Sequence, residues 1–356
     1  MARRRQRPRW FAPLAVTLGM AATLALGEFL LRVFDVVGRD YEAEHLRYRA
    51  QALRYAWDGL PPDDLGKFDL DGTLYRHKPS LDIDLGRYRL RTNRLGFRGP
   101  ELAVAKPANT VRILMLGDSV LYGTGVDDEV TFARRWEREL NGRGDRRYEV
   151  VNSGHPMYDT TQLRDEGLRL QPDLVVLVYV VNDVEPTRDV VEQALLGKPA
   201  RAEEELRAPG DLWTWLGGIA EPWLPATGKL LQLQSDAAVR WLATQPPGTE
   251  YVPERVGKGP RGWLRSQQAL LAMQQQCRAA GVPFVVLDHT MPAVRALPGF
   301  CGEHGIAYHE FRFTADELRL PIRNSMLDSH SNAAGHDLLL QKLRRIALAL
   351  PAVGSG

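Results

Sequence analysis

The chain has 356 residues, of which 44% are apolar and 25% are charged. That balance is typical of a globular protein and excludes a wholly disordered, collagen-like or polytopic membrane chain. The formal net charge is +2, but residues 1–40 carry seven arginines against three acidic groups, which leaves 39 basic and 41 acidic side chains in residues 41–356. The body of the chain therefore gives no indication of a nucleic-acid partner.

Residues 1–40 have the pattern of an export signal. Five arginines precede residue 10, and residues 10–27 are uncharged and mostly apolar. At about 1.5 Å of rise per residue, that stretch nearly crosses a hydrocarbon core of about 30 Å. Arginines at the entry stay cytoplasmic, so we expect a single-pass inner-membrane anchor with the rest of the chain in the periplasm.

Cleavage of this segment is the alternative. Ala25-Leu26-Gly27 offers small residues where a signal peptidase reads, whereas Phe29-Leu30-Leu31 prolongs the apolar run. We favour an uncleaved anchor over a cleaved signal. A buried core helix would need a polar face, which residues 13–27 lack.

The body begins with a polar, turn-rich lead-in over residues 41–107, which we expect to pack on the domain that follows. From residue 108 to residue 350, short apolar runs alternate with helical patterns. The runs are Arg112–Leu116, Tyr148–Val151, Leu174–Val181 and Pro283–Leu287. Continuous apolar strands that alternate with helices predict a parallel α/β sheet with right-handed crossovers.

Helix candidates lie between and after these runs. A helix is expected to start near Thr131. One apolar face is formed by Trp263, Leu270, Met273 and Cys277, and another by Leu339, Leu343, Ile346 and Leu350.

An insertion over about residues 184–262 interrupts this order. It holds four of the eight tryptophans, namely Trp213, Trp215, Trp223 and Trp241. Indoles bury large areas, so we expect the insertion to cap the ligand-bearing edge of the sheet. We expect its tryptophans to pack against other protein side chains rather than to stack on a sugar ring of a substrate.

The first apolar run ends in Gly117-Asp118-Ser119, ahead of a glycine-bearing loop. A serine at the carboxyl end of a parallel strand lies where α/β proteins bind ligands. Two further runs end in Gly154 and in Asn182-Asp183. The backbone N–H groups of Ser119 and Gly154 and the Asn182 amide could bind the oxyanion of an ester under attack, and losing one such donor costs about 3 kcal/mol of transition-state stabilisation.

Asp328 and His330 stand just before the last amphipathic helix. A neutral imidazole is a competent base near neutral pH, so His330 can take the proton of Ser119. Asp328 would hold the tautomer of that imidazole and stabilise the imidazolium.

With these blocks in this order, residues 108–350 resemble the SGNH, or GDSL, hydrolase superfamily, in its membrane-anchored bacterial branch. The resemblance implies a flavodoxin-like three-layer α/β/α fold with a parallel sheet. It also implies Ser119 as nucleophile, Gly154 and Asn182 as oxyanion donors, and Asp328 and His330 as the rest of the triad.

Three positions depart from the usual pattern of the superfamily. They are Val120 in place of leucine, Val180 in place of glycine, and an aspartate two residues before His330 rather than three. Upstream, residues 92–98 resemble a segment of membrane-anchored members. There we expect a turn at Leu95-Gly96 with Phe97 packed inward, and Arg98 is a weaker candidate for a role beside the cleft.

We therefore expect a serine esterase that acts on acyl, foremost acetyl, esters of an envelope or extracellular carbohydrate. Two alternatives remain open: an O-acyltransferase that moves the acyl group to a polysaccharide hydroxyl, and a catalytically inactive scaffold of polysaccharide machinery. Hydrolysis and transfer share the acyl-enzyme and differ only in the nucleophile that reaches it.

We expect no cofactor, because no metal-ligand or phosphate-loop spacing is present. The cysteines Cys277 and Cys301 are expected as buried thiols, with a disulfide as the alternative. Among the other histidines, His155 is a candidate for the cleft, Asp288-His289 a weak second acid/base pair, and His336 a structural residue.

Overall fold

The computed structural model describes residues 11–34, 40–55, 75–144, 146–156, 158, 160, 168–184, 219, 222–228, 230, 259–291, 293–325, 328–351 and 353. Most of the expected insertion, with Trp213, Trp215 and Trp241, lies outside these residues. Contacts divide the chain into two units: residues 1–40, 207–244 and 325–328 form one, and the remainder forms the other.

The smaller unit contains helix α1 (Phe11–Val33). Within it, Pro13–Val33 is long and apolar enough to cross a membrane. Its apolar side chains are almost all exposed, as Leu14, Val16 and Met20 illustrate. An exposed apolar helix of this length is typical of a membrane span or of a signal sequence.

The larger unit is built on a five-stranded sheet in the order β6-β5-β7-β8-β9. All neighbouring strands are parallel. The strands are β5 (Thr110–Gly117), β6 (Arg147–Gly154), β7 (Leu174–Tyr179), β8 (Phe284–Asp288) and β9 (Ala307–Glu310). Each of the four predicted apolar runs corresponds to one of the strands β5 to β8, which confirms the parallel α/β sheet.

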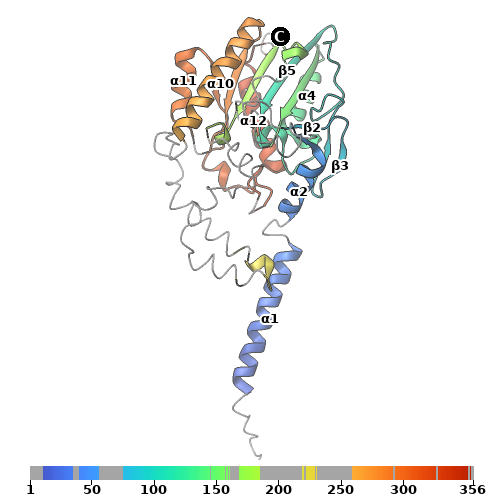
Figure 1. Cartoon of the computed structure of the whole chain (residues 1–356), viewed down its shortest axis with the longest axis vertical. Coiled ribbons are helices and arrows are strands. Elements are labelled where there is room, and N and C mark those ends of the chain that lie inside the picture. The colour runs from blue at the N-terminus through green and yellow to red at the C-terminus, as the bar shows by residue number, and fades with distance from the viewer. Residues whose placement is uncertain are drawn as a thin grey trace, which may run out of the picture. The chain divides into compact units, whose positions relative to one another are not determined.

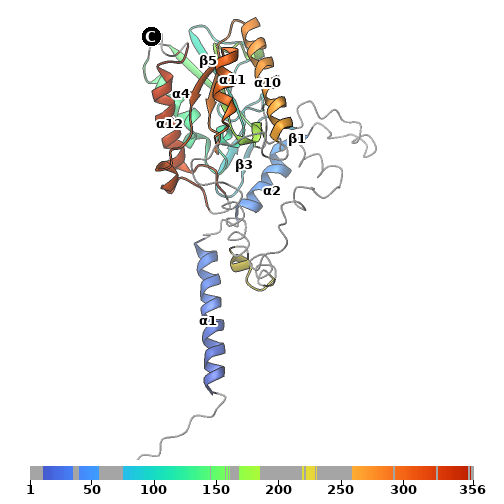
Figure 2. The same cartoon turned by 90° about the vertical axis from the view of Figure 1, so that its left-hand side faces the viewer.

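Helices cover both faces of this sheet, as Figures 1 and 2 show. Helices α4 (Phe132–Asn141) and α12 (Ala333–Ala347) pack on one face, and α10 (Gly259–Ala279) and α11 (Ala296–His304) on the other. The alternating side chains of β5 explain the division: Ile113 and Met115 join the cluster with α4 and α12, whereas Leu114 and Leu116 join the cluster with α10 and α11. The result is the expected three-layer α/β/α fold.

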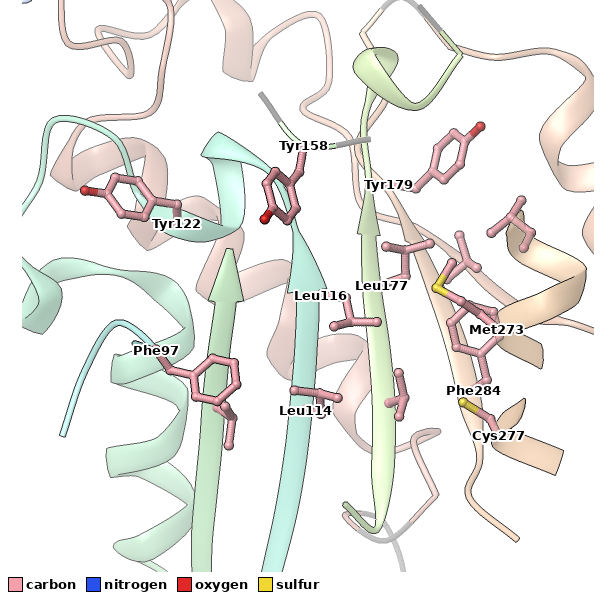
Figure 3. Packing of buried hydrophobic residues seen from close by; sticks show 14 of the residues in the cluster. Phe97, Leu114, Leu116, Tyr122, Tyr158, Leu177, Tyr179, Met273, Cys277 and Phe284 are labelled. Carbon is pink, nitrogen blue, oxygen red and sulfur yellow. The ribbon is translucent and has the colours of Figure 1, made fainter. Parts of the chain in front are cut away.

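Figure 3 shows the second cluster, in which Leu114, Leu116 and Leu177 face Met273 and Cys277 of α10. The predicted face of α10 is therefore confirmed. Helix α4 begins where expected, because the Thr131 side chain accepts a hydrogen bond from Arg134 N–H and caps the helix.

The lead-in contains α2 (Asp40–Ala52) and two small antiparallel sheets, β1 (Leu53–Tyr55) with β2 (Tyr75–His77) and β3 (Asp82–Asp84) with β4 (Arg89–Arg91). Its buried aromatic side chains belong to the same cluster as the sheet and α10; they are Tyr48, Tyr75, Tyr88 and Phe97. Gly96 adopts a left-handed conformation (φ +86°) and Phe97 is buried, as the sequence predicted.

Cys277 and Cys301 are buried and unpaired with each other. Burial raises the pKa of Cys277 to about 11 and that of Cys301 to about 12. Both therefore behave as small apolar side chains, as the sequence favoured.

His336 lies in the first turn of α12 and joins this helix to α4. Its Nδ1 accepts a hydrogen bond from Phe132 N–H, and its ring stacks on that of Phe132. Burial, followed by the charge of Arg98, lowers the pKa of His336 to about 3. The folded protein holds this imidazole neutral.

Acid should therefore unfold the domain through this histidine. Between an unfolded pKa near 6.5 and the folded value of about 3, only the unfolded chain binds the proton, so the stability present above pH 6.5 is lost as the pH falls. The expected slope is about 1.4 kcal/mol per pH unit for this group. Urea unfolding of the wild type and of His336→Gln between about pH 6 and pH 4 measures it, and equal slopes in the two proteins would refute this role.

Candidate active site

Ser119 opens the four-residue helix α3 (Ser119–Tyr122), directly after strand β5. The turn between them is tight, because a Cβ atom on Gly117 would lie 2.9 Å from the Cβ of Leu121. Gly123 ends α3 in a left-handed conformation (φ +82°). This strand-turn-helix arrangement places Ser119, which is 7% exposed, at the carboxyl end of the sheet.

The Asp118 carboxylate organises this turn. One of its oxygens accepts a hydrogen bond from Val120 N–H at 2.9 Å and so caps α3. The other accepts from the Ser119 hydroxyl at 3.0 Å and from Asn182 Nδ2 at 2.9 Å. One buried carboxylate therefore holds both the expected nucleophile and the expected oxyanion amide.

The charge on Asp118 is shaped by its surroundings. Burial raises the pKa of Asp118, whereas the hydrogen bond from Val120 N–H, the charge of His330 and the hydrogen bonds from Ser119 lower it.

Asn182 lies in the 3-10 turn Val181–Asp183 that follows β7. Asp183 fixes this turn, since its carboxylate accepts hydrogen bonds from Val180 N–H at 2.8 Å and from the Thr160 hydroxyl at 2.9 Å. The valine that replaces the usual glycine at position 180 thus supports the turn through its backbone. The Asn182 side chain is half-buried and directed to Asp118.

Gly154 ends β6 and lies against α3. A Cβ atom here would lie 2.3 Å from the backbone nitrogen of Tyr122, so no other residue fits without moving the nucleophile helix. The Gly154 N–H donates to Asn152 Oδ1 at 2.9 Å, while Asn152 Nδ2 donates to the Leu121 carbonyl. The Gly154 N–H therefore already has a hydrogen-bond acceptor. A substrate oxygen would have to share this N–H with Asn152 Oδ1 or displace that oxygen.

His330 is half-buried in the loop before α12. Asn324 ties this loop to the nucleophile: its N–H donates to the His330 carbonyl at 2.9 Å, and its Nδ2 donates to the Thr124 carbonyl at 2.9 Å. Gly125 (φ +82°) permits this approach, because a Cβ atom there would lie 2.2 Å from Asn324 Nδ2. A single asparagine thus joins the loops that carry Ser119 and His330.

Asp328 is fully buried and belongs by its contacts to the smaller unit. Its N–H donates to the Ser325 hydroxyl at 3.0 Å, and its carbonyl accepts from Ser325 N–H at 3.1 Å. Its pairing with His330 stays a prediction.

Arg98 supports the loop that follows α3, residues 122–126. Its guanidinium is buried and donates to the carbonyls of Tyr122, Gly123 and Val126. It also lies over the Tyr122 ring, 4.6 Å from the centroid. Arg98 therefore acts from the core side of the loop.

His155, the neighbour of Gly154, packs in the same aromatic core. Its ring stacks on those of His77 and Tyr158, with centroids 4.3 and 4.4 Å apart, and it is buried. Figure 3 shows Tyr122 and Tyr158 near the carboxyl ends of strands β5 and β6. These contacts give His155 a packing role.

Asp288 and His289 are also buried, and their contacts are structural. Asp288 accepts hydrogen bonds from Thr290 and Tyr308, and His289 Nδ1 lies 3.0 Å from the Phe311 carbonyl. Among the described residues, no group of three histidine, cysteine, aspartate or glutamate side chains is placed to hold a metal ion.

A cavity of about 400 Å³ lies elsewhere, along the edge strand β6. Its walls include Phe97, Arg98, Arg134 and Tyr148. Ser119, Asn182 and His330 contribute nothing to this lining, so the cavity is separate from the candidate site.

Comparison with known proteins adds a family match. The model of the GDSL-like lipase/acylhydrolase family matches residues 115–338, which contain every candidate site residue. No curated protein matches the chain.

Solved structures resemble the chain at low identity. The psychrotrophic esterase EstA from Pseudoalteromonas sp. is 11% identical with a TM-score of 0.37, and 67% of this chain and 95% of that one are covered. The acetyl xylan esterase AlAXEase is 13% identical (TM-score 0.35, 66% and 98% covered). AlinE4, an SGNH-hydrolase family esterase, is 15% identical (TM-score 0.31, 69% and 100% covered).

Replacing Asp118 tests its organising role. Asp118→Asn keeps only one acceptor oxygen, so either the cap on Val120 N–H or the acceptor shared by the Ser119 hydroxyl and the Asn182 amide is lost, and the nucleophile turn is disturbed in both cases. We expect kcat/KM on an activated ester to fall by roughly 10²-fold with the fold retained. Asp127→Asn removes an exposed carboxylate in the same region and should leave the rate unchanged. Full activity of Asp118→Asn would contradict the organising role.

Proposed function

The chain belongs to the GDSL-like lipase/acylhydrolase family and is an ester hydrolase of the SGNH type; we propose that it is a membrane-anchored serine esterase that removes acetyl groups from an envelope carbohydrate. The observation that carries this proposal is the shared contact of the Ser119 hydroxyl and the Asn182 amide with one buried carboxylate. It brings a nucleophile and a hydrogen-bond donor, 63 positions apart in the chain by their numbers, to one point at the sheet edge.

The first step of the proposed reaction is attack of Ser119 Oγ on the ester carbonyl carbon. The hydroxyl turns from Asp118 towards His330, whose imidazole takes the proton as the bond forms. Catalytic hydrogen bonds commonly tighten only when the substrate is present. Asp328 is proposed to orient that imidazole.

The oxyanion that forms is proposed to lie between Ser119 N–H, Gly154 N–H and Asn182. An amide group has two N–H donors, and Asp118 holds one of those of Asn182, which aims the group. His330 then gives its proton to the departing alcohol, and water attacks the acyl-enzyme to release the acid.

The size of the acyl group follows from the low exposure of Ser119. A nucleophile that is 7% exposed and flanked by the buried side chains of Leu121 and Tyr122 favours a short acyl chain. The choice of a carbohydrate as the substrate rests on the proposed location of the domain. A domain held outside the membrane by α1 would face cell-surface polysaccharide, and α1 is the element that supports that location.

Fluorophosphonate labelling of the full chain in detergent tests the nucleophile. We expect the wild type to be labelled and Ser119→Ala and His330→Ala to be silent, because an activated serine is required. Ser80→Gly, which removes an exposed serine of the lead-in, should be labelled like the wild type. Silence of the folded wild type would instead favour the inactive scaffold.

Asp328→Asn tests the third member of the proposed triad. With the tautomer of His330 no longer fixed, kcat should fall by ~10²–10⁴-fold while KM changes little. The initial rate of hydrolysis of an acetyl ester, measured as a function of the ester concentration, gives both constants. An unchanged kcat would remove Asp328 from the mechanism.

Product analysis separates hydrolysis from transfer. Incubating the chain with an acetyl ester, with and without an oligosaccharide, should give acetate in both cases by mass spectrometry. Acetylated oligosaccharide as the main product would show that a carbohydrate hydroxyl outcompetes water at the acyl-enzyme.

A further inference from the structure

The strongest unexplained contact in the smaller unit joins the anchor helix to the insertion. The Glu28 carboxylate, which is 6% exposed, accepts hydrogen bonds from Ala226 N–H at 2.9 Å, from Thr227 N–H at 2.8 Å and from the Thr227 hydroxyl at 2.9 Å. Residues 225–228 are helical, so the carboxylate satisfies N–H groups that the start of a helix leaves unpaired. This contact holds residues 222–228 beside Glu28, at one position along helix α1.

That level is the outer end of the apolar span. Glu28 is the first acidic residue of the chain, and Arg32, whose Nε lies 2.7 Å from it, is the first basic residue after the span begins. Exposed apolar side chains nevertheless continue past Glu28, at Phe29, Val33 and Phe34. The helix is thus still lipid-compatible for more than a turn beyond the contact, which puts the contact in the interfacial layer of a bilayer that α1 crosses.

The insertion exposes a large apolar side chain beside this contact. Trp223 is 84% exposed. Trp223 lies three residues before Ala226, so the Glu28 contact restrains its depth. Indole prefers the boundary between headgroups and acyl chains, where its ring is desolvated and its N–H stays hydrated.

We propose that residues 222–228 are a second membrane contact, in which Glu28 holds this part of the insertion against the bilayer and the Trp223 indole lies at the level of the lipid headgroups. The proposal rests on the membrane anchor proposed above. The occupant beside Trp223 is the bilayer itself, because the Glu28 contact holds residues 222–228 to the helix that is proposed to span it. A second copy of the chain covering Trp223 is the alternative that the experiment must exclude.

Site-specific quenching in vesicles tests this contact. The full chain is reconstituted in vesicles of phosphatidylcholine and phosphatidylglycerol, with the fluorophore NBD on a single introduced cysteine. Because Cys277 and Cys301 are buried, labelling is confined to the new site. Three positions are compared: Trp223→Cys, Val16→Cys inside the span, and Leu348→Cys at an exposed position of the larger unit.

A nitroxide near the headgroup should quench NBD at position 223 about twofold or more over position 348, as interfacial residues require. A nitroxide deep in the acyl chains should quench position 16. Adding Glu28→Ala should bring quenching at position 223 down towards that at position 348, because the hydrogen bonds that hold the insertion are gone.

The outcomes are distinct. If position 16 is quenched and position 223 behaves like position 348, the second contact is refuted and the anchor stands. NBD at position 223 that is shielded from water yet not quenched by lipid would assign this position to a contact with a second copy and overturn the proposal. Lack of quenching at position 16 would refute the anchor itself, and quenching at position 223 that survives Glu28→Ala would refute the role of Glu28.

Discussion

The candidate site depends on one buried charge, the carboxylate of Asp118. Removing a carboxylate from water costs several kcal/mol unless hydrogen bonds replace the lost hydration. Here Val120 N–H, the Ser119 hydroxyl and Asn182 Nδ2 replace it. The same three bonds cap α3, orient the nucleophile and draw the turn after β7 onto the turn after β5. The geometry of the site is thereby fixed before a substrate arrives, which is the condition for strong electrostatic stabilisation of an oxyanion.

Around this carboxylate, other polar groups position loops rather than react. Asn324 links the His330 loop to Thr124, Asp183 closes the Asn182 turn, and Arg98 binds carbonyls behind Tyr122. Asn324 and Arg98 join segments far apart in sequence, and all three side chains are partly or fully removed from solvent. The sheet supplies the common edge, and these side chains set the spacing of the loops along it.

The sequence predicted the parts of the fold that depend on local pattern. Apolar runs marked β5 to β8, the spacing of Trp263 and Met273 marked the buried face of α10, and Thr131 marked the start of α4. Strand β9 was missed because Ala307–Glu310 is an edge strand with exposed and half-exposed side chains and no apolar run. Helix α11 was missed because Pro298, Gly299 and Gly302 break the expected helical pattern.

At the site, sequence motifs located Ser119, Gly154 and Asn182 at or beside strand ends and His330 just before the last helix, but not their contacts. The organising role of Asp118 was not foreseen, since a carboxylate beside the nucleophile gives no sign of which loop it will bind. Asn324 carried no signal at all, because an isolated loop asparagine is common and its two partners lie 6 and 200 positions away in the numbering.

A crystal structure of the full chain after reaction with a phosphonate ester, which mimics the tetrahedral intermediate, would test the organising role of Asp118 most directly. We expect a bond between phosphorus and Ser119 Oγ, with a phosphoryl oxygen within hydrogen-bond distance of Asn182 Nδ2 while that amide still contacts Asp118. A phosphonate on another residue, or a phosphoryl oxygen directed away from Asn182, would contradict this role.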